Sequence, residues 1–248
     1  MKTLLIFDID GTIADSGEII DKSIYDLLSK IDRNKYELAL CGGGLFEKIK
    51  YQIKDLRFDH IFSECGSVYH KYIDQKLEKQ YEHLLVDHKL FPYFHLFLKK
   101  SLHFISNIIE GTSGYFIDIR HGLIYISLIG LQADKRDRER FYEKDSQFHY
   151  REKLLDELMK ISKQEGIQDE LTITLGGSTG IAIFPKEWSK VQIFNSISPR
   201  DYKNIYYFGD KYEENGNDYE LIHHPYTIGI KINTLSDTYN SLLNILEK

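Results

Sequence analysis

Short apolar runs alternate with amphipathic segments through the first third of the chain. Residues 4–7 predict a buried strand, and residues 36–40 and 60–62 predict two more. Residues 18–31 carry apolar side chains at helical spacing, and a second helix is predicted from about Leu45. Strands and helices in this order are typical of a parallel sheet that is covered by helices on both faces.

The middle of the chain has a different pattern. Residues 76–104 are rich in Leu, Phe and His, and we interpret them as helices. Two strand pairs are predicted, the first at 115–120 and 123–127 and the second at 171–175 and 180–184. Further helices are predicted at 134–142 and 151–165. Hairpins with interleaved helices indicate an antiparallel α+β unit inserted into the parallel one.

After Trp188 the parallel pattern resumes, with predicted helices at 190–196, 219–222 and 235–246 and strands at 205–208 and 226–232. The predicted fold class is therefore α/β, a doubly wound parallel sheet core with an inserted α+β cap domain of antiparallel sheet and helices. We assign residues 1–81 and 188–248 to the core and residues 82–187 to the cap.

Composition narrows the classes of function. Apolar residues form 42% of the chain, and the net charge of -6 leaves no basic footprint for nucleic acid or an anionic membrane. No stretch approaches the roughly 18 uninterrupted apolar residues of a membrane span, and the N-terminus lacks a secretory pattern. Cys41 and Cys65 are too few for a disulfide framework or a zinc site. Although pairing of the two stays open, these features favour a reduced, cytoplasmic protein.

The candidate chemistry lies at the ends of two apolar strands. Asp8 and Asp10 follow the first strand, and Asp210 and Asp218 follow the strand at 205–208. Carboxylates at the end of a buried strand are costly unless a cation offsets their charge. Because parallel strands present their carboxyl ends at one edge of the sheet, these groups are expected to converge. The sequence predicts a Mg²⁺-dependent phosphoryl-transfer site with all four carboxylates as metal-binding groups.

The same segments suggest individual roles. Asp8 is the predicted nucleophile, since a carboxylate that accepts and hands on a phosphoryl group divides one hard displacement into two easier ones. Asp10 is predicted to protonate the leaving oxygen and later deprotonate the incoming hydroxyl. Gly42 and Gly43 would let backbone N–H groups approach phosphate oxygens, and Lys190 would neutralise the transferring group. A solvated helix position for Lys190 and a plain strand–helix turn for the glycines stay open.

In order and spacing, these motifs resemble the haloacid dehalogenase superfamily, and more closely its eukaryotic-type phosphomannomutases, over nearly the whole chain. The stretches that carry the likeness are 7–12, 42–48, 62–66, 116–122, 127–130, 141–145, 176–177, 184–188 and 208–220. The resemblance implies a haloacid-dehalogenase-like core and interconversion of hexose 6- and 1-phosphates, such as those of mannose, through a bisphosphate. It also implies a cap that binds the sugar phosphate and carries a homodimer interface. The substrate contacts it implies are Gly42, Gly43, Arg120, Arg138, Gly177 and Asn217.

Several positions depart from the family pattern. Arg120 and Arg138 fall on family arginines that bind the distal phosphate, whereas a third such arginine falls on Leu131. Other family polar side chains are replaced by small ones: an arginine of the first loop by Gly17, a serine of the glycine loop by Gly44, and a serine and an aspartate of the second cap hairpin by Gly180 and Ala182.

These departures bear on the reaction. Each lost charge-assisted contact to phosphate costs on the order of 1.5–3 kcal/mol, so two missing arginines would weaken binding by roughly 10²–10⁴-fold. A looser hold on the distal phosphate lets water compete for the aspartyl-phosphate, which makes a sugar-phosphate phosphatase the alternative function. A non-catalytic sugar-phosphate-binding protein is the third hypothesis, and it is disfavoured because a binding module has no need of Asp8. A pairing of Arg120 with Asp118 and a solvated position for Arg138 also stay open.

Overall fold

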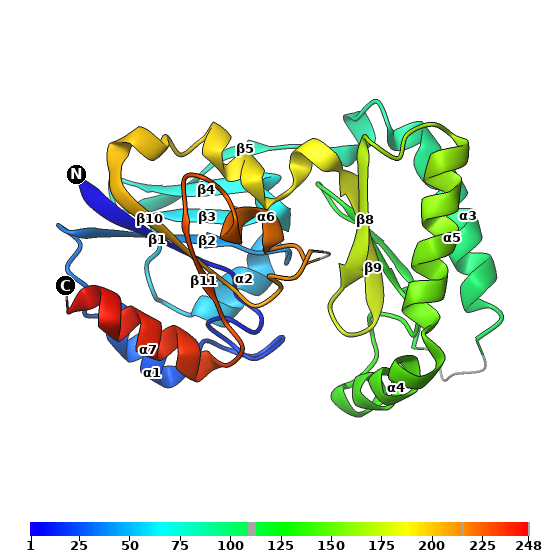
Figure 1. Ribbon diagram of the computed structural model, residues 1–248, viewed down its shortest axis with the longest axis horizontal. Helices are drawn as coiled ribbons and strands as arrows, with labels where there is room; N and C mark the ends of the chain where they lie inside the picture. The colour runs from blue at the N-terminus through cyan, green and yellow to red at the C-terminus, as the bar shows by residue number, and fades with distance from the viewer. Residues whose placement is uncertain (109–112, 215, 248) are drawn as a thin grey trace. The chain divides into compact units, whose positions relative to one another are not determined.

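The computed structural model describes residues 1–108, 113–214 and 216–247 (Figure 1). The chain forms two compact units, of which unit 1 comprises Met1–His83 and Trp188–Lys248 and unit 2 comprises Leu84–Glu187. Within the described ranges, none of the helices combines the length and the apolar character needed to cross a membrane.

Unit 1 is built on a seven-stranded sheet in the order β11-β10-β1-β2-β3-β4-β5. Its strands are β1 (Lys2–Phe7), β2 (Tyr36–Cys41), β3 (His60–Ser63), β4 (Val68–Ile73), β5 (Lys76–Glu82), β10 (Tyr202–Gly209) and β11 (Ile228–Lys231). The pairs from β11 to β3 are parallel, whereas β4 and β5 add antiparallel strands at one side. Phe7 pairs with Phe208, so the segments that follow β1 and β10 leave the sheet at the same edge.

Helices cover both faces of this sheet (Figure 1). They are α1 (Lys22–Leu28), α2 (Phe46–Ile53), α6 (Tyr219–Ile222), α7 (Leu235–Leu246) and the 3₁₀ helix η5 (Lys190–Asn195). Leu5 and Phe7 of β1 pack with α1, α2 and α7, while the alternate residues Leu4 and Ile6 pack with η5 and α6. A strand that is apolar on both sides is what a sheet buried on both faces requires. The predicted doubly wound α/β core is confirmed.

The segment at residues 76–82 contradicts the sequence prediction. It was predicted as part of a helical region, but it forms β5, which pairs antiparallel with β4. Its apolar side chains are only Leu77 and Tyr81, and most of its residues are exposed, as suits the edge of a sheet. Pairing with β4 decides its conformation, because strand preference depends mainly on neighbouring strands.

Unit 2 contains a four-stranded antiparallel sheet in the order β6-β7-β9-β8. Its elements are α3 (Phe94–Ile105), β6 (Ile117–Ile119), β7 (Ile124–Ser127), α4 (Lys135–Phe148), α5 (Tyr150–Gln164), β8 (Leu171–Gly176) and β9 (Gly180–Pro185). Helices α3 and α5 lie together on one side of the sheet (Figure 1). Ile181 and Ile183 of β9 are fully buried, while the alternate residues Gly180 and Ala182 share the opposite face with Tyr125. We call this second face the helix-free face.

Candidate active site

Three carboxylates meet at the edge of the unit 1 sheet. Asp8 follows β1, Asp210 follows β10, and Asp218 directly precedes α6. Each offers a carboxylate oxygen within 4.8 Å of the other two, and Asp8 and Asp218 are almost completely buried. The parallel register of β1 and β10 brings these segments together although they are far apart in the sequence.

Lys190 is the buried cation of this group. Its Nζ lies 2.5 Å from Asp8 Oδ1 and 2.7 Å from Asp218 Oδ1, and the residue is 1% exposed. Burial opposes the charged form, but the carboxylates of Asp218 and Asp8 outweigh it and hold the pKa of Lys190 well above its ordinary value. Lys190 is therefore a fixed positive charge beside the predicted nucleophile and is not a solvated helix residue.

Asp8 and Asp210 are destabilised as anions in this arrangement. Burial raises the pKa of Asp8. The charge of Lys190 opposes this rise, and the neighbouring acidic groups add to it. Burial also raises the pKa of Asp210, against the lowering effect of Lys211. The ammonium groups of Lys190 and Lys211 therefore do not fully offset the burial of Asp8 and Asp210, and an added cation would lower both pKa values.

The oxygens of Asp210 support a cation at this position. Asp210 Oδ1 is buried and has no hydrogen-bond partner among the described residues, while Oδ2 accepts a bond from Lys211. Gly11, at φ +87°, lies so close that a Cβ there would stand 2.5 Å from Asp210 Oδ2. A buried oxygen without a donor is costly unless it binds a ligand. Oxygen donors alone suit a hard divalent cation, so the acidic group fits a metal site.

Asp10 lies apart from these three carboxylates, although it was predicted as the fourth metal-binding group. Its Oδ2 is 2.5 Å from Lys48 Nζ, and its Oδ1 accepts bonds from Gln52 Nε2 at 2.8 Å and the N–H of Gly17 at 2.9 Å. Burial raises the pKa of Asp10, but Lys48 and these donors more than offset this, so the pKa is lowered. Asp10 is therefore held as a carboxylate, the form that can accept a proton.

The predicted phosphate-binding glycines differ in their surroundings. The N–H of Gly42 donates to the carbonyl of Phe62, so the sheet already uses it. Gly43 faces the side chains of Cys65 and Asn217, whose Sγ and Nδ2 lie 3.7 and 3.9 Å from where its Cβ would be. The structure thus brings Gly43 and Asn217 together and leaves Gly42 with a structural role.

Of the two predicted arginines of unit 2, Arg120 lies over the Tyr125 ring, whereas Arg138 bonds to backbone carbonyls. The Arg120 guanidinium lies 5.2 Å from the Tyr125 ring centroid, and its Nε is 2.6 Å from Asp118 Oδ2, as the structural alternative anticipated. Arg138 is exposed and donates from Nε to the Ala133 carbonyl at 2.9 Å. Burial raises the pKa of Tyr125, and the charges of Arg120, Arg151 and Arg138 oppose this rise, so all three lie within electrostatic reach.

Tyr125 fills space that side chains would otherwise occupy. A Cβ on Gly176 or Gly180 would stand 2.7 Å from the Tyr125 ring, and the Tyr125 hydroxyl donates to the Gly176 carbonyl at 2.6 Å. Ala182 packs in the same small cluster. At Gly180 the backbone oxygen of Ile126 is closer still, 2.2 Å from where a Cβ would be, so neither Gly176 nor Gly180 has room for a side chain. Gly177, at φ +56°, accepts a bond from Arg151 at 2.9 Å through its carbonyl.

Several residues of these sites were missed from the sequence, including Tyr125 and also Tyr207, whose hydroxyl bonds to Lys190 and Asp218. Lys48 and Gln52 lie one helical turn apart on α2, a spacing that could have indicated a shared partner. Tyr207 and Arg151 gave no such signal. A tyrosine in a strand usually belongs to the core, and an arginine in a helix usually lies on the surface.

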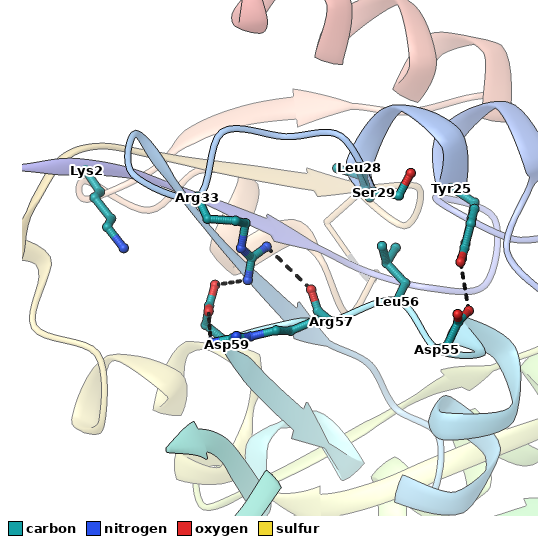
Figure 2. A pocket seen from close by; sticks show the side chains of 9 residues that line it. All are labelled: Lys2, Tyr25, Leu28, Ser29, Arg33, Asp55, Leu56, Arg57 and Asp59. Atoms are coloured by element: carbon teal, nitrogen blue, oxygen red, sulfur yellow. Dashed lines mark hydrogen bonds and ion pairs between the residues drawn. The ribbon is translucent and has the colours of Figure 1, made fainter. Parts of the chain in front are cut away.

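Unit 1 also contains a cavity of about 350 Å³ (Figure 2), and its lining does not include Asp8, Asp210 or Asp218. Its basic residues are paired: Arg33 with Asp59 at 2.6 Å, Arg57 with Asp59 at 3.7 Å, and Lys2 with Glu37 at 3.3 Å. Lys2 begins β1 and Asp59 precedes β3, so the cavity lies at the amino ends of the strands. Ligands of parallel sheets bind at the carboxyl ends, and the cavity therefore carries no part of the proposed chemistry.

Comparison with known proteins gives consistent matches. The family described as eukaryotic phosphomannomutase matches residues 24–248. The phosphomannomutase of Babesia bovis is 34% identical, with 100% of this chain and 99% of the relative covered. The phosphomannomutase of Encephalitozoon cuniculi is 31% identical, covering 100% and 94%.

Solved structures support the fold. IMP-bound, N-terminally truncated IMP-nucleotidase of Plasmodium falciparum matches with a TM-score of 0.70 at 14% identity, covering 100% of this chain and 68% of that one. The C-terminal domain of trehalose-6-phosphate phosphatase from C. albicans matches with a TM-score of 0.58 at 15% identity, covering 84% and 70%. The fold is thus haloacid-dehalogenase-like, and the chain belongs to the eukaryotic phosphomannomutase family.

Proposed function

We propose that this protein is a Mg²⁺-dependent phosphomannomutase that interconverts mannose 6-phosphate and mannose 1-phosphate through an aspartyl-phosphate on Asp8. The observation that carries the proposal is the buried group of Asp8, Lys190, Asp210 and Asp218 in a chain of this family. A carboxylate nucleophile beside a fixed ammonium and a candidate cation site is the arrangement that phosphoryl transfer through an enzyme carboxylate requires.

The chain's own residues divide the work of the reaction. Asp8 attacks phosphorus and becomes phosphorylated, and Lys190, 2.5 Å from Asp8 Oδ1, offsets negative charge on the transferring group. Asp10 is held ionised by Lys48, so it accepts the proton of the incoming sugar hydroxyl. By microscopic reversibility it returns that proton to a leaving oxygen in the opposite half-reaction.

The candidate cation site completes the charge balance. Asp8 and Asp210 are the carboxylates that would hold Mg²⁺, with the buried Oδ1 of Asp210 as an open acceptor. When bound, the ion lowers the repulsion between the carboxylates and an approaching phosphate. Asp218 completes the acidic group, but protein donors already bond to both of its oxygens.

Unit 2 is proposed to bind the sugar phosphate. Arg120 and Arg138 supply positive charge, and the helix-free face supplies the ring of Tyr125 in place of polar side chains at 180 and 182. Guanidinium groups bind phosphate strongly, because their hydrogen bonds are charge-assisted. Gly177 and Asn217 are retained as proposed contacts.

The test is phosphorus NMR of the protein with Mg²⁺, mannose 6-phosphate and a catalytic amount of hexose bisphosphate. A mutase gives mannose 1-phosphate and little inorganic phosphate. Inorganic phosphate without mannose 1-phosphate would replace the mutase assignment with the phosphatase alternative. Binding of the sugar phosphate with neither product would indicate the non-catalytic alternative.

A homodimer formed through unit 2 and a cytoplasmic location are further parts of the proposal, supported by the family relationship alone. Light scattering of the whole chain at several concentrations measures the first directly. A monomeric mass at micromolar concentration would contradict it. Substitution of exposed apolar residues of unit 2, such as Leu102 and Met159, is then the way to locate the interface.

A further inference from the structure

A buried tyrosine lies behind the candidate active site. Tyr207 is on β10, is fully buried, and directs its hydroxyl at two of the charged residues. The hydroxyl donates a hydrogen bond to Asp218 Oδ1 and accepts one from Lys190 Nζ at 3.3 Å. No step of the proposed reaction uses this residue.

Tyr207 completes the hydrogen bonding of Lys190. An ammonium group has three N–H donors, and Lys190 has three acceptors: Asp8 Oδ1 at 2.5 Å, Asp218 Oδ1 at 2.7 Å and the Tyr207 hydroxyl. With an acceptor for each of its three N–H groups, the ammonium loses a bond if it moves away from any of these partners. Lys190 is therefore held in place against Asp8.

The same hydroxyl also fixes Asp218. Asp218 Oδ1 accepts from both Lys190 and Tyr207, and its Oδ2 accepts from the N–H of Lys211 at 2.9 Å. The donor from Tyr207 offsets part of the negative charge of Asp218. Lys190 is then drawn less strongly toward Asp218, which leaves more of its positive charge directed at Asp8.

We propose that Tyr207 is a positioning residue that locks Lys190 against the nucleophile Asp8 through Asp218. It acts through Lys190 and does not touch the substrate. The kinetic part of this inference rests on the proposed function, whereas the placement of the ammonium does not.

The matched pair of variants is Tyr207→Phe and Tyr206→Phe. Each removes one hydroxyl from β10, but Tyr206 is only partly buried and packs against the opposite face of the sheet. For the Mg²⁺-loaded protein we expect Tyr207→Phe to lower kcat about 10–100-fold, the usual cost of removing a partner that orients a metal-site residue. KM of Tyr207→Phe for mannose 6-phosphate should stay within about twofold of the parent value. In Tyr206→Phe, both kcat and KM should stay within about twofold of the parent values.

A second measurement needs no turnover. In ¹H–¹⁵N spectra of lysine side chains, a buried, hydrogen-bonded ammonium exchanges its protons slowly and gives a signal, which Lys190→Met identifies by its loss. Tyr207→Phe should broaden or abolish that signal, and Tyr206→Phe should leave it. In the Lys190→Met background, adding Tyr207→Phe should lower kcat little further, because the two residues act together.

The inference is overturned if the Lys190 signal is unchanged in Tyr207→Phe, or if kcat remains within about twofold of the parent. It is also overturned if Tyr207→Phe lowers kcat by the same factor in the Lys190→Met background as in the parent protein. If the parent protein turns over no sugar phosphate, the proposed function fails, and the ammonium signal alone decides the role of Tyr207.

Discussion

We call the group of Asp8, Asp210, Asp218 and Lys190 the carboxylate edge of unit 1. This edge and the helix-free face of unit 2 hold their proposed functional residues in opposite ways. At the carboxylate edge, Asp8, Asp218 and Lys190 are buried and bonded to one another. On the helix-free face, Arg120 directly follows β6, pairs with Asp118 of that strand and lies over the Tyr125 ring, and Gly180 and Ala182 have no polar side chain.

This difference shows where substitution is tolerated. Removing one member of a buried charge pair leaves its partner uncompensated, which typically costs about 3–5 kcal/mol. Only 15% of the Arg120 side chain is exposed, but its partner Asp118 is 30% exposed, so removing Arg120 should cost the fold less than removing a fully buried charge. The proposed catalytic residues are therefore held by mutual pairing, whereas the proposed substrate-binding residues can change one at a time.

The largest effect is expected for Lys190→Met. It leaves Asp8 and Asp218 buried without their cation, so the free energy of unfolding should fall by about 3–5 kcal/mol and kcat by at least about 100-fold. Urea denaturation and steady-state kinetics measure the two. Lys211→Met, which removes a more exposed lysine from the same site, is the control. Equal stability of Lys190→Met and the parent would contradict the pairing.

Substitution of Arg120 should affect binding and spare the chemical step. Arg120→Met is expected to raise KM for the sugar phosphate about tenfold, near the lower end of a charge-assisted contact, with kcat within about threefold. Arg136→Met, on an exposed part of α4, is the control. A fall in kcat at constant KM would place Arg120 in the chemistry and remove the contrast between the two regions.

A polar network around Glu37 on β2 should affect the stability of unit 1 at acid pH. His60, whose Nε2 lies 3.7 Å from Glu37 Oε2, lowers the pKa of Glu37 to about 2 despite partial burial, with help from the hydrogen bonds donated by Tyr202 and Lys2. Since the folded pKa lies below the ordinary value of 4.5, the stabilisation is present above about pH 4.5 and is lost as the pH falls toward 2.

The variant Glu37→Gln should therefore be less stable than the parent at pH 7 and should show a flatter fall in melting temperature between pH 4.5 and pH 2. Thermal melts followed by circular dichroism at several pH values measure this. Glu78→Gln, on the exposed edge strand β5, is the matched control. Parallel pH curves for Glu37→Gln and the parent would show that Glu37 contributes nothing to acid stability.

The smallest effect is expected for Tyr125→Phe on the helix-free face. The variant loses the bond to the Gly176 carbonyl, worth about 1 kcal/mol, but keeps the ring beside Arg120. KM should remain within about twofold in Tyr125→Phe and rise further in Tyr125→Leu, which removes the ring. Equal KM values in the two variants would show that the ring has no part in holding Arg120.

The sequence anticipates the carboxylate edge better than the helix-free face. Asp8 and Asp210 could be placed because parallel strands end at a common edge, so two motifs at strand ends suffice. The bonds of Asp10 to Lys48 and Gln52 depend on how α2 packs, which no local pattern states. The prediction for residues 76–82 was wrong, because strand pairing with β4 outweighs local preference.

Tyr207 and Tyr125 illustrate a second limit. Both read as ordinary strand residues, and their roles depend on neighbours from other segments: Lys190 and Asp218 for Tyr207, and Gly176 for Tyr125. A hydroxyl group becomes functional through its partners, and those partners are fixed by tertiary packing. Sequence patterns identify the charged groups but not the residues that hold them.

The most direct test of the central claim is to identify the phosphorylated residue. The protein is mixed with Mg²⁺ and a hexose bisphosphate, quenched, reduced with borohydride to convert an aspartyl-phosphate to homoserine, and mapped by peptide mass spectrometry. We expect the reduced residue at position 8 and its absence in Asp8→Asn. Reduction at another carboxylate, or mannose phosphate turnover by Asp8→Asn at the parent rate, would contradict the account.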